Sequence, residues 1–290
     1  MNLSAVVVTR NDNYGGNLND RAIFCLNSLV NTFDEVILVD WNSDKGPLLW
    51  DINDKIEKTD KLKHIVIPPD IAKHLTNFDP HAQVCNEVLG RNIGIRRATG
   101  DYIVSTNIDV IAPKREDLEK AIQEQFNDNT FYTISRRHTD WETIENFCGG
   151  TREYSRWREI REHLIENSEE RTTKEEVVKG DDFSIINCCG DFQLAHRDIW
   201  NTIKGFEEDL IYVLYSDTNV QKKAVMHGYD LKAVYSPALF HIYHGKGGGG
   251  FLDGINRKVN DMDRAIVNQK ETQNTNNWGF NNIDIEFETF

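Results

Sequence analysis

The chain has 290 residues, with 33 Lys and Arg against 47 Asp and Glu, so its formal net charge is −14 when the histidines are neutral. This excess of acid excludes a protein built to wrap nucleic acid, because such binding draws much of its affinity from Lys and Arg that neutralise phosphates. An anionic small ligand would need local help from backbone N–H groups, a few placed arginines or a metal ion.

Hydrophobic residues make up 39% of the chain, which is enough to bury a sizeable core. The apolar run at residues 3–8 is too short to span a bilayer and is predicted to be a buried strand, so no transmembrane segment is expected. The five cysteines are odd in number and show no CxxC spacing, which argues against a disulfide framework or a zinc knuckle. The cytosol is therefore the expected location.

Over the first 135 residues, short runs rich in β-branched side chains alternate with amphipathic stretches. This alternation predicts an α/β fold in which helices cover a mostly parallel sheet. Strands are predicted at residues 3–9, 35–40, 64–67, 101–107 and 131–135. Helices are predicted at residues 19–32 and 87–98, each with apolar side chains on one face.

The second half of the chain is less regular. Residues 151–182 are dense in charge, which favours solvated helices, with a functional lid as the alternative. Apolar order returns at residues 191–195 and 231–234, and a glycine-dense turn at 245–250 precedes a predicted helix at 253–268. The Asn-rich residues 274–282 are expected to form an ordered loop or a frayed terminus.

Polar residues follow three of the predicted strands. In an open α/β sheet, ligands bind beyond the carboxyl ends of the strands. The three strand ends read Thr9-Arg10-Asn11, Asp40-Trp41-Asn42 and Asn107-Ile108-Asp109. Asn and Asp also favour ordinary turns, but three such ends on one edge of a sheet indicate a binding site.

Two common nucleotide motifs are missing from the sequence. A dinucleotide-binding fold would carry G-x-G-x-x-G after the first strand, and a P-loop would carry G-x-x-x-x-G-K-[ST]. Gly15-Gly16 has neither spacing. Oxidoreductase and NTPase activities therefore lose their main support.

The most specific motif is the run Arg91-Asn92-Ile93-Gly94-Ile95-Arg96-Arg97-Ala98-Thr99-Gly100-Asp101-Tyr102-Ile103, which leads to the triplet Asn107-Ile108-Asp109. Supporting segments are residues 6–11, 36–43, 189–191, 204–206, 216–217 and 241–244. Taken in chain order, these segments resemble the GT-A glycosyltransferases, specifically the family-2-like group that uses nucleotide-sugar donors. The resemblance covers roughly residues 3–245.

The resemblance implies a GT-A fold with a mostly parallel, Rossmann-like sheet and a less regular acceptor side. It implies one catalytic domain over residues 1–290. Within it, residues 1–135 form a nucleotide-sugar-binding half, 136–250 an acceptor and catalytic half that contains the charged insertion at 151–182, and 251–290 a helix and tail.

A divalent cation is the expected cofactor. A nucleotide diphosphate leaving group concentrates negative charge, which Mg²⁺ or Mn²⁺ stabilises as the glycosidic bond breaks. The resemblance implies that Asp109 anchors this ion, although Asn107 replaces the first acid of the family's D-x-D pattern and brings no charge. Relatives often add a histidine after the last strand, for which His241 and His244 are candidates, with His244 preferred. A turn aspartate and hydrogen-bonded structural histidines are the alternatives.

The resemblance also assigns contacts with the nucleotide and with its phosphates. The candidates are Thr9, Arg10, Asn11, Asp40, Asn42, Arg91, Asn92, Arg96, Asn107, Ile108 and Lys246. An ionised Asp40 would accept a hydrogen bond from a pyrimidine N–H or a ribose hydroxyl. The arginines offer a bidentate fork to a phosphate or to a carboxylate that shapes the pocket.

Inverting transfer requires a base that takes the proton from the attacking hydroxyl. Relatives use the Asp of an acidic pair at the start of a helix, and Ser216-Asp217 occupies that position, so only Asp217 carries over. The alternative for Asp217 is a helix N-cap, which is compatible with the first role. Asp191 is the second candidate for the base, with hydrogen bonding to a sugar hydroxyl as its favoured role.

These observations favour a cytosolic, metal-dependent glycosyltransferase that moves a sugar from a UDP- or GDP-sugar to a hydroxyl of a glycan acceptor, with inversion. A nucleotidyltransferase that forms sugar nucleotides is one alternative, but it would carry a basic, glycine-rich loop after the first strand, and residues 9–16 contain a single basic residue. A non-catalytic nucleotide- or glycan-binding relative is the other, because Asn107 and Ser216 both stand where acids are expected.

Overall fold

The computed structural model describes residues 1–79, 84–149, 153–168, 190–210, 216–244 and 274–288, together with the backbone of residues 176–178. The predicted helix at residues 253–268 and the glycine-dense turn with Lys246 lie outside the described residues. Within the described part, no helix is both long and apolar enough to cross a bilayer.

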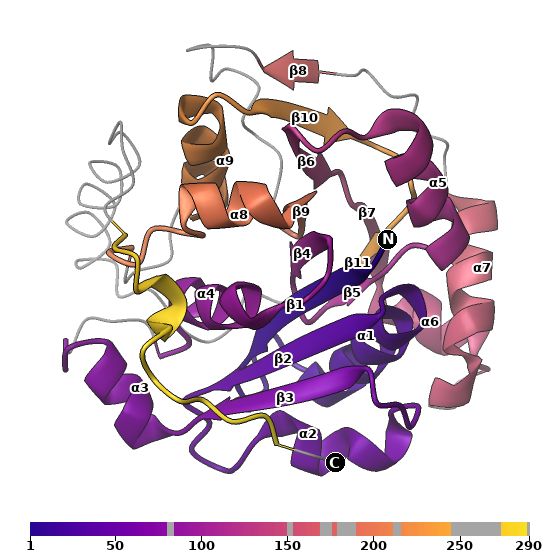
Figure 1. The fold of residues 1–290 in the computed structure, drawn as a ribbon. Coiled ribbons are helices and arrows are strands. Elements are labelled where there is room, and N and C mark those ends of the chain that lie inside the picture. Colours follow the sequence, from indigo (N-terminus) through magenta and orange to yellow (C-terminus); the bar gives the residue numbers. More distant parts are fainter. Residues whose placement is uncertain are drawn as a thin grey trace, which may run out of the picture.

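A large mixed sheet forms the centre of the fold (Figure 1). Its strand order is β3-β2-β1-β4-β9-β6-β10-β8. The strands are β1 (Leu3–Thr9), β2 (Glu35–Trp41), β3 (Leu62–Ile67), β4 (Tyr102–Thr106), β6 (Thr130–Ile134), β8 (Glu176–Val178), β9 (Phe192–His196) and β10 (Asp230–Val234). β3, β2, β1 and β4 are parallel neighbours, β6 and β10 form a second parallel pair, and β9 joins the two groups antiparallel to both β4 and β6. The predicted, mostly parallel α/β sheet is confirmed.

A second, three-stranded sheet has the order β5-β11-β7. Its strands are β5 (Val110–Ile111), β7 (Arg137–Asp140) and β11 (Phe240–Tyr243). The sequence did not predict it, because two to four residues are too few to show a period of two and β7 is polar throughout. The chain therefore leaves the large sheet after Thr106 and pairs again, in the small sheet, from Val110.

Helices pack on both faces of the large sheet, as the alternation of residues along β1 requires. Leu3, Ala5 and Val7 join one apolar cluster and Val6 and Val8 another, so every side chain of this strand's apolar run is buried. The helices are α1 (Leu18–Thr32), α2 (Leu48–Ile52), α3 (Pro69–Leu75), α4 (Glu87–Arg97), α5 (Arg115–Gln125), α6 (Trp141–Phe147), α7 (Trp157–Asn167), α8 (Arg197–Ile203) and α9 (Ser216–Met226), with short 3-10 turns at Asn53–Lys55, Tyr154–Arg156 and Trp278–Phe280.

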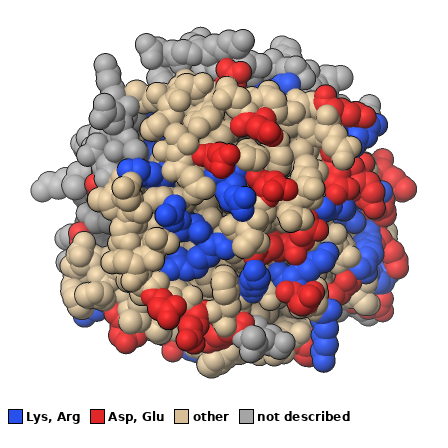
Figure 2. All heavy atoms as spheres, in the orientation of Figure 1, with Lys and Arg blue, Asp and Glu red and all other residues tan. Residues whose placement is uncertain are grey.

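The predictions for α1 and α4 are confirmed to within one residue at each end. In the described part of the charged insertion the expected helix is present as α7, but it is not wholly solvated, because Trp157, Ile160 and Leu164 are buried against the small sheet. These three residues recur every three or four positions, which is the spacing of one helical face. The high content of charged residues at 151–182 made this narrow apolar face hard to recognise in the sequence. On the face of the molecule shown in Figure 2, basic side chains are interspersed with acidic ones.

Residues 274–288 pack against α4 and reach the edge strand β3 (Figure 1). Trp278 is buried, and Arg97 donates hydrogen bonds to the carbonyl oxygens of Gly279 and Ile283 at 2.8 and 3.1 Å. The backbone N–H of Glu288 donates to the carbonyl oxygen of His64 at 2.8 Å. Of the two expectations for residues 274–282, the ordered loop is confirmed.

Two glycines let α4 approach β1 closely. A Cβ atom at Gly94 would lie 2.4 Å from Cγ1 of Val6, and one at Gly90 would lie 2.8 Å from Cγ1 of Val8. Contacts under 3.0 Å force a neighbour to move. The close approach matters for the site, because the first turn of α4 lies at the carboxyl edge of the sheet.

We expect Gly94→Ala to destabilise the fold by about 1–3 kcal/mol, because the new methyl group overpacks Val6. Chemical denaturation measures the free energy of unfolding. In the Val6→Ala background, where the clashing methyl groups are absent, Gly94→Ala is expected to destabilise clearly less. Equal losses in the two backgrounds would contradict this packing account.

Candidate metal and ligand site

Asp109 lies where the chain passes from the large sheet to the small one. Its backbone carbonyl accepts a hydrogen bond from the N–H of Ile242 at 2.8 Å, and the next residue, Val110, pairs with His241. This antiparallel pairing brings the end of β11 beside Asp109. Two residues that are 132 or more positions later in the chain are thereby placed next to one carboxylate.

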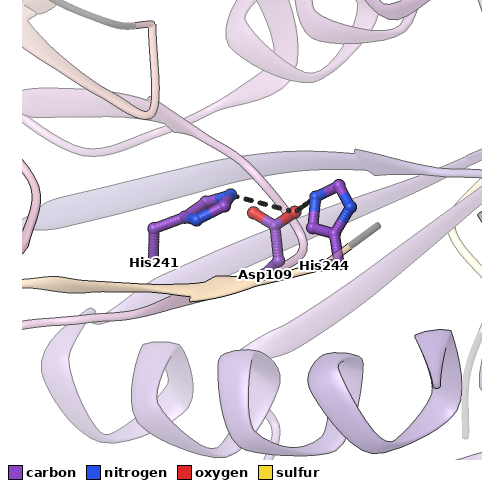
Figure 3. Close-up of side chains that lie close together, drawn as sticks. All are labelled: Asp109, His241 and His244. Carbon is purple, nitrogen blue, oxygen red and sulfur yellow. Dashed lines mark ion pairs between the residues drawn. The ribbon is translucent and has the colours of Figure 1, made fainter. Parts of the chain in front are cut away.

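His241 and His244 both direct Nε2 toward Oδ2 of Asp109 (Figure 3). The distances are 3.6 Å from His241 and 2.9 Å from His244. Asp109 and His241 are buried, and one ligand atom from each of the three residues lies within 4.8 Å of the others. Adjacent ligands of an ion with bonds of about 2.1 Å lie about 3 Å apart, so the cluster has the spacing of a partial coordination sphere.

The surroundings of Asp109 keep its carboxylate ionised, which is the form that binds a cation. Burial by itself raises the pKa of Asp109, but the hydrogen bonds and charges of His241 and His244 outweigh it and hold the pKa well below its usual range. Asp109 Oδ1 and His241 Nδ1 are buried and have no hydrogen-bond partner among the described residues. A carboxylate with two imidazoles fits Mn²⁺, which accepts both ligand types, better than Mg²⁺, which prefers oxygen.

Sequence reasoning missed two residues at this cluster. Arg21, on α1, is buried and has Nη1 3.2 Å from Oδ2 of Asp109. Tyr14, in the loop before α1, is half exposed and packs its ring edge-on against His244 at 5.1 Å between centroids. The available signal was the charged pair Asp20 and Arg21 within an otherwise uncharged helix.

Asn107 belongs to a polar network beside the cluster. Its amide oxygen accepts from Arg91, and its amide nitrogen donates to Oδ1 of Asp191 at 2.7 Å. Arg91 also bonds Ser105 and Glu87, and Asp191 is paired through Oδ2 with Arg136. The structure thus brings Arg91, Asn107 and Asp191 together, but every charged group in this network already has an opposite charge beside it.

Asp217 lies in the first turn of α9 and is close to the same network. Its carboxylate is half-buried and accepts hydrogen bonds from the N–H of Thr218 at 2.8 Å and of Gly190 at 3.1 Å. Gly190 directly precedes Asp191, and a Cβ atom there would lie 2.6 Å from Cβ of Asp217. The two candidate bases are therefore neighbours in space.

Hydrogen bonds join the loop after β1 to the loop after β2. Arg10 donates from Nε to the carbonyl oxygen of Asn42 at 2.8 Å and pairs with Asp12 and Asp44. The amide nitrogen of Asn11 donates to Gly46 and Asp51 across the same gap. Thr9 ends β1 with a buried hydroxyl that has no hydrogen-bond partner among the described residues.

Asp40 is fully buried, and both of its carboxylate oxygens are engaged inside the protein. They accept hydrogen bonds from the hydroxyl of Ser43 and from the N–H of Leu48, the latter at 2.7 Å. In this structure Asp40 therefore closes the loop between β2 and α2 and does not face a ligand. Burial raises the pKa of this carboxyl to about 6, although its two hydrogen bonds oppose the rise.

Three other residues that were predicted to contact the nucleotide direct their side chains to other parts of the protein. The buried amide of Asn92 bonds the backbone of Phe206 and the carboxylate of Glu208. The guanidinium of Arg96 stacks on Trp278 at 4.9 Å, and Ile108 is part of the apolar core. Asn92 contacts the backbone after α8 and Arg96 contacts Trp278, and the motif alone could not reveal these partners. Lys246 lies outside the described residues.

Solved structures share this fold at low sequence identity. The similar structures include S. aureus TarS 1-349 in complex with UDP-GlcNAc, at a TM-score of 0.55 and 16% identity over 95% of this chain and 68% of that one. TarS 1-349 in complex with UDP matches with a TM-score of 0.51 and 16% identity over 84% of this chain and 61% of that one. Mannosyltransferase PcManGT from Pyrobaculum calidifontis, in complex with GDP-Man and Mn²⁺, matches with a TM-score of 0.51 and 15% identity over 93% of this chain and 65% of that one.

These similarities confirm the GT-A fold that the sequence motifs implied. This chain spans 61% to 68% of the length of the three chains it matches. No protein-family model matches the sequence, and no curated protein matches it. At such identities the likeness is one of fold.

The raised pKa of Asp40 predicts a pH dependence of stability. The folded state binds more protons than the unfolded state between the unfolded value of 3.8 and the folded value of about 6. Stability is therefore lost as pH rises through this window, by roughly 2–3 kcal/mol at most. Thermal unfolding of the wild type and Asp40→Asn from pH 4 to 7 checks this, because the variant should gain on the wild type as pH rises. A constant difference between the two proteins would refute it.

The cluster predicts Mn²⁺ binding that depends on both histidines. Titrations in which free Mn²⁺ is followed by electron paramagnetic resonance, with and without UDP or GDP, should show affinity at least about tenfold weaker in His241→Ala and in His244→Ala. His138→Ala is the matched control, because the exposed His138 ring packs edge-on against His241 but is not one of the three residues of the cluster. Equal losses in all three variants would argue against the cluster as the ligand set.

Proposed function

We propose that the protein is a metal-dependent glycosyltransferase that moves a sugar from a UDP- or GDP-sugar to a hydroxyl of a glycan acceptor, with inversion at the anomeric carbon. The observation that carries the proposal is the Asp109, His241 and His244 cluster at the carboxyl edge of a GT-A sheet. This is the edge at which open α/β sheets bind their ligands. The nucleotide sugars and Mn²⁺ bound to proteins of the same fold support the choice of donor and ion.

Asp109, His241 and His244 would hold Mn²⁺, with Mg²⁺ as the second choice. The ion would supply positive charge opposite the diphosphate as the glycosidic bond breaks. His244 is the preferred histidine, because its Nε2 is closer to Asp109 and its side chain is more exposed than that of His241.

The donor's nucleoside would lie across the first two strand ends. Thr9 offers an unpartnered hydroxyl there, and the partly exposed Asn11 and Asn42 border the same gap. Arg10 and Asp40 would act by fixing the two loops, since their side chains already bond protein groups. Arg91 would orient Asn107, whose amide then faces the donor without adding charge.

Asp217 is the favoured general base. An ionised carboxylate can accept the proton of the attacking hydroxyl, and the Asp217 side chain is half-buried rather than enclosed. Asp191 is less suited, because it is buried and its carboxylate is paired with the charged Arg136, whereas the more exposed Asp217 accepts hydrogen bonds from neutral backbone N–H groups. We assign Asp191 the task of holding Asn107 and of bonding a sugar hydroxyl.

The proposal also includes a cytosolic location. Cys25 and Cys85 are free thiols. Free thiols persist in reducing compartments.

Calorimetry with UDP and GDP, with and without Mn²⁺, followed by detection of nucleotide released from a panel of UDP- and GDP-sugars, tests the function. We expect Mn²⁺-dependent nucleotide binding and acceptor-dependent release. Binding without any transfer would favour a non-catalytic relative, and release of pyrophosphate from a nucleoside triphosphate and a sugar phosphate would favour a nucleotidyltransferase. Either outcome would overturn the proposal.

Asp217→Asn should lower kcat by about 100-fold or more while nucleotide affinity changes little, because the amide cannot take the proton. Asp198→Asn is the matched control, since Asp198 is an exposed first-turn aspartate on the neighbouring helix α8. A wild-type rate in folded Asp217→Asn would remove this residue from the mechanism.

A further inference from the structure

Arg21 is the charged residue at the cluster that the proposed function leaves without a role. Its Nη1 lies 3.2 Å from Oδ2 of Asp109, the same oxygen that faces both histidines. The side chain is 1% exposed, so this contact is shielded from water. A buried guanidinium stays charged under all ordinary conditions.

The same guanidinium holds the loop between β1 and α1. Arg21 donates from Nε to the carbonyl oxygen of Gly16 at 3.2 Å and from Nη2 to that of Tyr14. This loop contains Asn13, Gly15, Gly16 and Asn17 at positive φ, and its Tyr14 ring contacts His244. One side chain thus joins the candidate ligand Asp109 to a loop that borders the same site.

The balance of charge at the cluster is unusual for a cation site. Asp109 supplies one negative charge, and Arg21 cancels it. Asn107 stands where a second acid would be expected, and the nearby Asp191 is paired with Arg136. The charges of Asp109 and Arg21 cancel, as do those of Asp191 and Arg136, so these residues offer ligand atoms to a divalent ion but no net negative charge.

We propose that Arg21 makes cation binding conditional on a nucleotide diphosphate. With Arg21 in place, the ion alone is held weakly, and the negative charge that completes its site comes from the diphosphate. The nucleotide diphosphate then raises the affinity for the cation, and the cation raises the affinity for the diphosphate by the same factor, since such coupling is reciprocal. This inference rests on the proposed function, because it takes the diphosphate of the donor as the second ligand.

Mn²⁺ titrations followed by electron paramagnetic resonance test this with no turnover required. The wild type should bind Mn²⁺ at least about tenfold more tightly with saturating UDP or GDP than alone. Arg21→Met keeps the apolar stem and removes the charge, so it should bind Mn²⁺ alone about tenfold more tightly than the wild type and gain correspondingly less from the nucleotide. Arg21→Lys, which keeps the charge, should retain weak binding of Mn²⁺ alone.

Arg161→Met is the control, because Arg161 is a buried arginine on α7 that bonds the carbonyl of Pro113 away from the cluster. A purely structural role for Arg21 would weaken Mn²⁺ binding in Arg21→Met, and this result, or an unchanged affinity, overturns the inference. Arg21→Gln takes the place of the Met variant if that variant does not fold, as judged by thermal melts. Equal wild-type affinity for Mn²⁺ with and without nucleotide overturns the inference as well. If the wild type binds neither UDP nor GDP even with Mn²⁺, the proposed function itself fails.

Discussion

The candidate site depends on one backbone hydrogen bond, from the N–H of Ile242 to the carbonyl oxygen of Asp109. This bond and the neighbouring pair of Val110 with His241 fix the small sheet against the end of β4. Without them Asp109 would be a turn residue after a parallel strand. The two histidines, which are distant in the sequence, would not be held beside it. The chemistry of the site therefore follows from the passage of the chain from the large sheet to the small one. That passage needs only three residues, 107–109.

Local neutralisation is the second theme of the site. The protein has a net charge of −14, yet the acids nearest the cluster each lie beside an arginine: Asp109 beside Arg21 and Asp191 beside Arg136. Burying a lone carboxylate would be costly, so such pairing allows these groups to sit in a dry site. On the inference drawn above, the affinity of the site for ions would depend on which partner each acid already has.

The sequence predicted the parts of the fold that have long periodic patterns and the parts of the site that carry a motif. β1, β2, α1 and α4 were placed to within one or two residues, and the resemblance implied the grouping of Asp109 with His241 and His244. The sequence did not predict the direction in which each side chain points. Asp40 and Arg96 belong to matching motifs, but the buried Asp40 accepts a hydrogen bond from Leu48, and the partly exposed Arg96 stacks on Trp278. Arg21 was missed since no motif includes it and its partner is 88 residues away.

The clasp of residues 274–288 around α4 and β3 bears on the order of folding. Trp278 completes the apolar layer outside α4, and Glu288 bonds the backbone of His64 on the edge strand. The outer layer of the first hundred residues is thus supplied by a segment that is synthesised much later than they are. Contacts at such sequence separation form slowly, because a large loop must close first. Residues 1–100 should therefore reach their final packing only after translation of the clasp, and until then the exposed apolar face of α4 would be a target for chaperones.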